Sequence, residues 1–128
     1  MAVFRPQEKK QVCELNFDDK YKYELLLHED VARTIAAAAE KQLKLVEGLK
    51  ENDASVIDKA YNAALDAIDE ILGEGAGADI MSLYEKPGLV DVAEVITFIG
   101  QEYKAAYSER LKVYKSTGNV PPAARGRR

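Results

Sequence analysis

Few side chains in this 128-residue chain could take part in catalysis, and they are far apart in the sequence. His28 is the only histidine, so a metal cluster or a nucleophile–base pair would depend on it alone. A histidine at the surface or at the start of a helix is the simpler interpretation. Cys13 is the only cysteine, which excludes an intramolecular disulfide and favours a reducing compartment. Its apolar-alternating surroundings favour a packed thiol over a reactive one.

Two further patterns resemble functional sites without completing one. Asp66, Asp69 and Glu70 fall within one or two helical turns, where paired carboxylates could act as acid and base. The solvated face of a helix is the simpler explanation for them. The glycines of residues 73–77 resemble a phosphate-binding loop, but they follow a helix rather than a strand and lack the Lys-Ser/Thr ending. We therefore expect no catalytic residue, no cofactor and no metal site, and hence a protein that is not an enzyme.

Composition narrows the class of protein further. The net charge is -4, although the chain ends in a basic cluster of Arg125, Arg127 and Arg128. An acidic body repels phosphate backbones, which argues against binding to nucleic acid. No apolar run is long enough to cross a membrane, and the first residues show no signal-peptide pattern. We expect a soluble protein of the cytoplasm, with one domain that is large enough to bury a core.

Apolar residues at helical spacing predict a mainly α-helical domain with about four helices, over residues 30–50, 55–72, 78–85 and 89–115. Asp30 is the expected N-cap of the first helix, and Gly73 is placed for a left-handed cap that ends the second. Pro87 closes the short third helix. The final helix is the longest periodic run, and its first half is almost entirely apolar.

A short N-terminal β-hairpin or extended arm is expected before these helices. Polar and apolar residues alternate with a period of two over residues 12–27, and Asp18 and Asp19 supply the polar turn that a hairpin requires. An unpaired arm is the alternative that the pattern leaves open. The expected divisions of the chain are a flexible lead-in (1–11), a single mainly helical domain (12–115) and a disordered basic tail (116–128).

The order of these elements, together with the segment Ile68-Asp-Glu-Ile-Leu-Gly-Glu-Gly75, resembles the small tail assembly chaperones of long-tailed bacteriophages and prophages of Gram-positive bacteria. In that family, a helix that ends in an Asp/Glu-x-x-Leu-Gly-Glu-Gly-like motif precedes a short helix and a terminal helix. The resemblance extends over residues 12–115. The motif marks a structural feature and not an active site.

The resemblance implies a non-enzymatic protein of the bacterial host cell that coats the long, apolar, helical tape-measure protein and helps to recruit tail-tube subunits during tail assembly. It supplies no catalytic residue to this chain. The alternative is a small oligomeric structural or adaptor subunit that stays in a finished phage particle or a cellular complex. The two interpretations differ in whether the partner is released.

A chaperone of this kind needs apolar helix surface that its own core does not use. Phe98 lies off the main apolar stripe of the last helix, so this helix is either covered on two sides or exposes an interface. Tyr103, Tyr107 and Tyr114 lie on the main stripe and share one side of the helix, where core packing and a protein-binding stripe are both open interpretations. We also expect self-association, through the apolar last helix and the small residues 36–39. The expected partner-binding residues are Ile80, Met81, Tyr84, Tyr103 and Tyr107.

Overall fold

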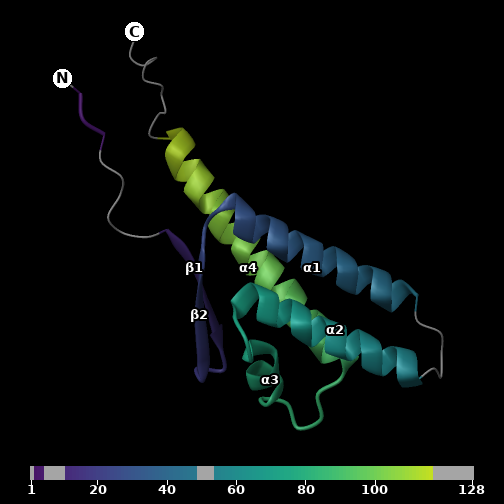
Figure 1. The fold of residues 1–128 in the computed structure, drawn as a ribbon. Helices are drawn as coiled ribbons and strands as arrows, with labels where there is room; N and C mark the ends of the chain where they lie inside the picture. Colours follow the sequence, from purple (N-terminus) through teal and green to yellow (C-terminus); the bar gives the residue numbers. More distant parts are fainter. Residues whose placement is uncertain (1, 5–10, 49–53, 117–128) are drawn as a thin grey trace.

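The computed structural model describes residues 2–4, 11–48 and 54–116, which form two antiparallel strands followed by four helices. The expected mainly α-helical fold is confirmed, and its N-terminal element is a paired hairpin (Figure 1). Residues 5–10 of the expected lead-in and residues 117–128 of the expected basic tail lie outside the described residues. The elements are β1 (Val12–Phe17), β2 (Tyr21–Leu26), α1 (Glu29–Glu47), α2 (Ala54–Leu72), α3 (Ala76–Met81) and α4 (Leu89–Ser116).

The hairpin turns at the two aspartates that the sequence indicates. Phe17 lies opposite Tyr21, and residues 18–20 connect the strands. Asp18 and Asp19 have φ angles of 57° and 58°, as the central residues of a type I′ turn do. Short polar side chains tolerate this left-handed conformation, so the turn forms without glycine. The residues of β1 that point into the core are Cys13, Leu15 and Phe17.

The start of α1 differs from the expectation. His28, and not Asp30, is the N-cap, because its backbone is extended and its Nδ1 accepts a hydrogen bond from Asp30 N at 3.0 Å. Asp30 lies in the first turn, where its carboxylate and that of Glu29 interact favourably with the helix dipole. A neutral imidazole nitrogen can accept the bond that a hydroxyl or carboxylate oxygen usually accepts at this position. The interpretation of His28 as a residue at the start of a helix is confirmed.

The glycine-rich segment after α2 ends that helix as its spacing predicts. Gly73 and Gly75 have φ angles of 121° and 87°, which residues with a Cβ atom avoid. Asp69 then accepts a hydrogen bond from Gly77 N at 2.7 Å. This bond fastens the beginning of α3 to the last turn of α2. Asp69 belongs to the segment that resembles the chaperone motif, and it therefore has a structural role there.

The boundaries of α3 differ most from those expected. The helix begins at Ala76 because Gly75 is its N-cap, and it ends at Met81 rather than at residue 85. After Met81 the backbone continues in single turns, in which Tyr84 N donates to Met81 O three residues back. The ends of the other helices shift by smaller amounts, and α1 ends at Glu47 with Gly48 as its C-cap.

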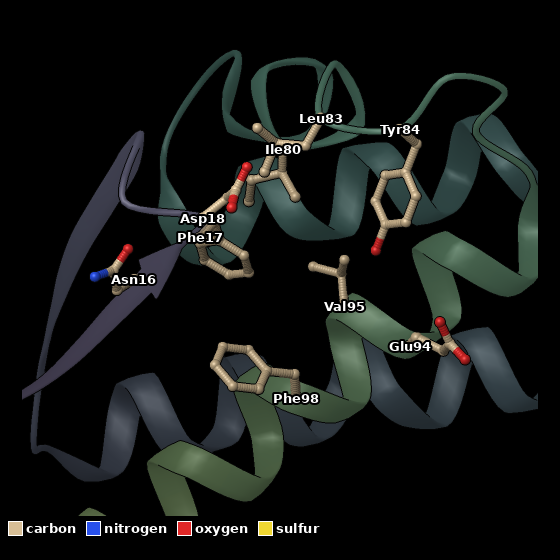
Figure 2. A pocket seen from close by; sticks show the side chains of 9 residues that line it. All are labelled: Asn16, Phe17, Asp18, Ile80, Leu83, Tyr84, Glu94, Val95 and Phe98. Atoms are coloured by element: carbon tan, nitrogen blue, oxygen red, sulfur yellow. The ribbon is translucent and has the colours of Figure 1, made fainter.

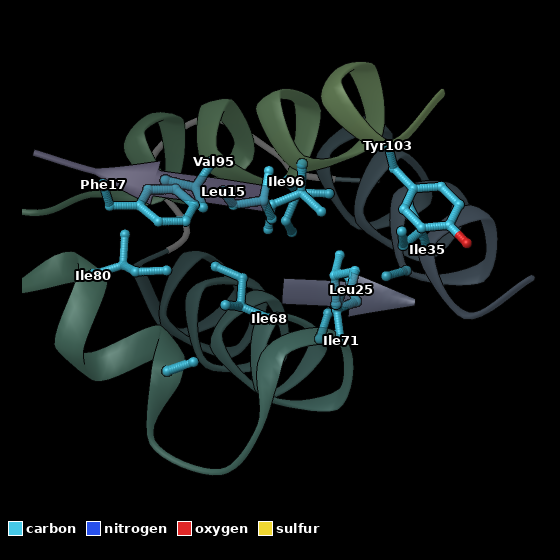
Figure 3. Close-up of a cluster of buried hydrophobic side chains, with 14 of the residues drawn as sticks. Leu15, Phe17, Leu25, Ile35, Ile68, Ile71, Ile80, Val95, Ile96 and Tyr103 are labelled. Carbon is cyan, nitrogen blue, oxygen red and sulfur yellow. The ribbon is translucent and has the colours of Figure 1, made fainter. Parts of the chain in front are cut away.

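The three long helices pack against one another, and the hairpin packs against α4 and α2. Figure 1 shows α4 passing behind α1 and α2, with the hairpin to one side and α3 beside the end of α2. The core lies where these elements meet (Figure 3), and each fully buried aliphatic side chain there contributes about 1.5–3 kcal/mol. No described helix is both long and apolar enough to cross a membrane. The largest fully buried side chains are Leu15, Ile68, Ile80, Val92 and Ile99.

Candidate functional site

The structure separates the five residues that were expected to bind a partner. Ile80 and Met81 of α3 and Tyr103 of α4 are only 1%, 3% and 3% exposed. They belong to the hydrophobic core, so the expectation that they remain available to a partner is wrong. For α3 the physical reason is that its attachment to α2 turns its apolar side inwards. Tyr84 and Tyr107 remain partly exposed.

Tyr103 uses its hydroxyl inside the molecule. The hydroxyl oxygen accepts a hydrogen bond from His28 N at 2.8 Å, and its proton is shared between Leu26 O at 2.8 Å and His28 O at 2.9 Å. These backbone groups lie where β2 passes into α1. Tyr103 therefore joins α4 to this junction and supplies a hydrogen-bond partner to His28 N and Leu26 O, while His28 O also accepts a bond from Ala32 N. Of the two roles considered for Tyr103, the structure supports core packing.

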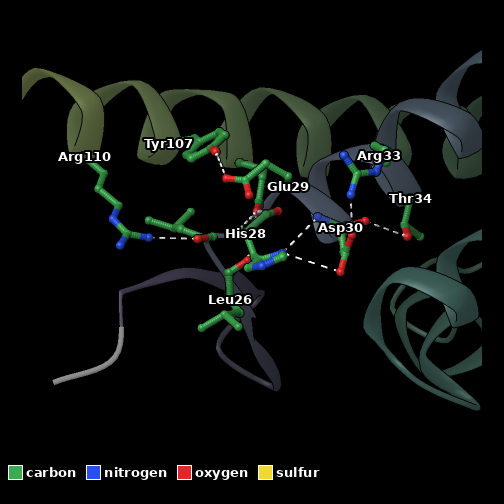
Figure 4. Close-up of polar contacts among 10 residues, drawn as sticks. Leu26, His28, Glu29, Asp30, Arg33, Thr34, Tyr107 and Arg110 are labelled. Atoms are coloured by element: carbon green, nitrogen blue, oxygen red, sulfur yellow. Dashed lines mark hydrogen bonds and ion pairs between the residues drawn. The ribbon is translucent and has the colours of Figure 1, made fainter. Parts of the chain in front are cut away.

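Tyr107 takes part in a polar contact on the surface, one turn further along α4 (Figure 4). Its hydroxyl donates to Glu29 Oε2 at 2.5 Å, and the nearby Arg110 Nη1 donates to Leu27 O at 2.8 Å. The hydrogen bond from Tyr107 lowers the pKa of the Glu29 carboxyl, and the charge of Arg33 acts in the same direction. The same hydrogen bond raises the pKa of Tyr107. Tyr107 is thus occupied by a contact within the chain, although its side chain stays partly exposed.

Tyr84 lies beside a cavity of about 450 Å³ between the tip of the hairpin, α3 and the first half of α4, which we call the hairpin pocket (Figure 2). Figure 2 shows the Tyr84 hydroxyl directed toward Val95, with the carboxylates of Asp18 and Glu94 on two sides of the cavity. No hydrogen bond joins this hydroxyl to another described residue. The apolar part of the lining consists of Phe17, Ile80, Leu83, Val95 and Phe98.

A second hollow of about 460 Å³, which we call the α1–α4 groove, lies between the end of α1 and the beginning of α4. Val90 and Phe98 are 70% and 37% exposed there, and Val46 of α1 faces them. Large apolar side chains that are exposed together in one hollow are typical of an interaction site. The remaining lining residues are Leu89, Ala93, Glu94, Thr97 and Gln101.

Phe98 and Glu94 line both hollows, so the pocket and the groove form one continuous surface, which we call the Phe98 surface. The Phe98 ring is held on its inner side by an edge-to-face contact with Phe17, with centroids 5.5 Å apart and an interplanar angle of 72°. The off-stripe position of Phe98 in the sequence was the one signal of this surface. Val46 of α1 and Val90 of α4 were missed. For Val90 the reason is that the nearly all-apolar start of α4 does not show which side the neighbouring helix covers.

Neither Cys13 nor the acidic side chains form a reactive site in the described part of the chain. Burial, together with the negative charges of Glu102 and Glu14, raises the pKa of the Cys13 thiol, which therefore stays protonated. The interpretation of Cys13 as a packed thiol is confirmed, since it is buried in the core. Within the described ranges, no group of three or more His, Cys, Asp or Glu side chains is placed to hold a metal ion.

Comparisons with protein-family models, with curated proteins and with solved structures find no match to this chain. The geometry and chemistry of the Phe98 surface are therefore the basis for a functional proposal.

Proposed function

We propose that this chain is a non-enzymatic binding protein that holds an amphipathic helix of a client protein on its Phe98 surface, as a small phage tail assembly chaperone does. The proposed client is the apolar, helical tape-measure protein, to which tail-tube subunits are then recruited. The single observation that supports the proposal best is the α1–α4 groove, where large apolar side chains lie exposed in one hollow between two helices.

The arrangement of α1 and α4 suits a helical client. The two helices are antiparallel, because Glu29 near the start of α1 contacts Tyr107 late in α4, whereas Val46 near the end of α1 lines the same hollow as Val90 early in α4. Two adjacent helices present a groove into which the side-chain ridges of a third helix can pack. A client with apolar residues at spacings of three and four would cover Val46, Val90 and Phe98. Burial of this apolar area, at about 25 cal/mol per Å², favours the complex.

Co-expression with a fragment of a tape-measure protein tests the proposal. The wild-type chain is expected to keep the fragment soluble. A groove variant, Val90→Ser with Phe98→Ser, is expected to lose most of this effect because it removes the apolar centre of the groove. Leu111→Ser is the matched control, since Leu111 is also on α4 and is 46% exposed but lies outside the groove. This control is expected to hold the fragment as the wild type does.

Circular dichroism of each variant separates a loss of binding from a loss of fold. A wild-type chain that keeps no tape-measure fragment in solution would show that the proposed function is wrong. A folded groove variant that holds the fragment as well as the wild type would place the client elsewhere on the molecule. Mass spectrometry of mature particles tests the alternative raised by the sequence, because a retained structural subunit is present there and a chaperone is absent.

A further inference from the structure

We infer that the hairpin pocket receives an arginine side chain from the helix that binds in the α1–α4 groove, so that the client is a basic amphipathic helix. This inference rests on the proposed function, because it assigns the chemistry of the same partner. The pocket and the groove meet at Phe98 and Glu94. A helix that lies in the groove can therefore direct a flanking side chain into the pocket.

The lining of the pocket fits a long side chain with an apolar stem. Leu83, Tyr84 and Phe98 supply accessible apolar surface in the pocket, whereas the carboxylates of Asp18 and Glu94 belong to exposed residues on two of its sides. The methylene groups of an arginine or lysine side chain can pack on such a surface while the charged group reaches the carboxylates. A short polar side chain cannot make both contacts at once.

The charges around the Phe98 surface favour a cation over an anion. Neither the pocket nor the groove has a lysine or arginine in the lining contributed by the described residues. Lys20, beside the hairpin tip, and Lys86, close to Tyr84 in sequence, are exposed and line neither hollow. Burial raises the pKa of Tyr84, and the negative charges of Asp91 and Glu94 raise it further. The local potential is therefore negative, which attracts a basic client and repels an acidic one.

This one-sided charge is not shared by the hollow between α1 and α2. That hollow is lined by Arg33 and Lys41 as well as by Glu70, so both signs of charge are present. A basic helix would meet two cations there. Electrostatic selection therefore favours the Phe98 surface over the α1–α2 hollow.

The aromatic side chains favour arginine over lysine. Phe17, Tyr84 and Phe98 all line the pocket. A guanidinium group stacks on aromatic faces and can form two parallel hydrogen bonds to one carboxylate, whereas an ammonium group is a compact point charge. The Tyr84 hydroxyl points into the pocket and has no described partner, so its oxygen can accept a further N–H bond. One arginine could thus use the apolar, aromatic and acidic parts of the pocket together.

Three synthetic helical peptides, each about 20 residues long, test the inference by fluorescence anisotropy with the full-length chain. They share one apolar face and carry arginine, glutamine or glutamate at the flanking positions. At low salt we expect the arginine peptide to bind about tenfold more tightly than the glutamine peptide, and the glutamate peptide to bind most weakly. Binding of the glutamine peptide tests the groove, and the preference for arginine tests the pocket.

Conservative variants locate the source of the preference. Asp18 lines the pocket but not the groove, and Asn tolerates the positive φ of this position, so Asp18→Asn keeps the turn and removes the charge. Asp18→Asn is expected to reduce the preference for arginine severalfold and to leave the affinity for the glutamine peptide unchanged. Glu94→Gln is also expected to reduce the preference for arginine severalfold, and its effect on the glutamine peptide is measured beside it, because Glu94 lines the groove as well. Glu102→Gln is the control, because Glu102 is exposed on α4 and lines neither hollow.

Equal affinities for the arginine and glutamine peptides, with binding that Val90→Ser abolishes, would overturn the inference and leave the proposed function standing. An arginine preference that is unchanged in Asp18→Asn would also overturn the inference, because the cation would then lie outside the pocket. The same holds if Glu102→Gln lowers the preference as much as Glu94→Gln does. Binding of none of the peptides would count against both the groove and the pocket.

Discussion

Hydrogen bonds decide which tyrosines of α4 belong to the core. Tyr103 and Tyr107 lie about one turn apart, and their ring centroids are 6.0 Å from each other. Tyr103 bonds to backbone groups at the junction of β2 and α1, whereas Tyr107 bonds to the exposed carboxylate of Glu29. Helical periodicity places both tyrosines on one side of the helix, but it carries no information about what their hydroxyl groups meet.

Replacement of Tyr103 by phenylalanine should lower the free energy of unfolding by about 1–3 kcal/mol, because backbone groups of Leu26 and His28 lose their partner in a part-buried site. Urea denaturation measures the change. Tyr61→Phe is the control, since the Tyr61 hydroxyl makes no hydrogen bond to a described residue, and it should have little effect. Equal losses in both variants would mean that the hydrogen bonds of Tyr103 do not stabilise the fold.

The contact between Tyr107 and Glu29 predicts a pH dependence. The pKa of Glu29 is lower in the folded state than in the unfolded state. The ionised Glu29 therefore stabilises the fold at pH values above its unfolded-state pKa, and this stabilisation is lost as the pH falls through its folded-state pKa. Tyr107→Phe should therefore raise the pKa of Glu29, which NMR titration of the carboxyl carbon can follow. The variant should be less stable than the wild type at neutral pH and equally stable in strong acid. An unchanged pKa of Glu29 would show that the hydrogen bond is absent in solution.

At the level of elements, two helical glycines have opposite roles. A Cβ atom on Gly77 would lie 2.9 Å from Leu65 O and 3.1 Å from Asp69 Oδ1, so glycine is required where α3 approaches α2. A Cβ atom on Gly100 of α4 would meet only Ile35 Cγ2, at an ordinary contact distance of 3.8 Å. Gly77 permits the backbones of α3 and α2 to approach closely, whereas Gly100 only lowers the helix propensity of α4.

Alanine substitutions distinguish these roles. Gly77→Ala should lower the free energy of unfolding by about 1–3 kcal/mol, because backbone atoms must move to admit the methyl group. Gly100→Ala should raise it by up to about 1 kcal/mol, because alanine has the higher helix propensity and fits the space. Chemical denaturation of both variants, side by side, measures the difference in sign. Stabilisation by Gly77→Ala would contradict the described packing of α3 on α2.

Most of the elements could be predicted because their signals are local. The period-two alternation of β1, the apolar spacing of α2 and the stop at Gly73 each lie within a few residues of the structure they specify. The start of α3 was misplaced because it depends on a hydrogen bond between Asp69 and Gly77, which are on different elements. The cap of α1 was misplaced because histidine rarely has that role.

At the level of the whole molecule, the binding surface was harder to predict than the fold. Ile80 and Met81 were expected outside the core, but α3 turns them inwards. The early part of α4 is apolar on more than one side, and only the packing of α1, α2 and the hairpin against α4 decides that Val92 and Val95 are buried while Val90 is exposed. Such a choice depends on contacts between distant elements, which the pattern within one helix does not contain.

Self-association is expected when no client is present, because a second copy can cover the exposed apolar residues of the Phe98 surface. Sedimentation velocity over a range of concentrations should show reversible oligomers of the wild type. The Val90→Ser, Phe98→Ser variant should shift this equilibrium toward the monomer, whereas Leu111→Ser should not. A wild-type chain that remains strictly monomeric at high concentration would contradict this prediction.

The most direct test of the central claim, that a client helix lies in the α1–α4 groove, is a methyl NMR titration of the wild-type chain with a helical tape-measure fragment. This measurement needs no substitution, so it cannot be confused by a change of fold. The proposal predicts shifts or broadening of the Val46, Leu89 and Val90 methyl signals, while those of Ile57 and Leu111, which are exposed outside the groove, stay unchanged. Perturbations centred on Ile57 or Leu111, or no perturbation at saturating fragment, would contradict it.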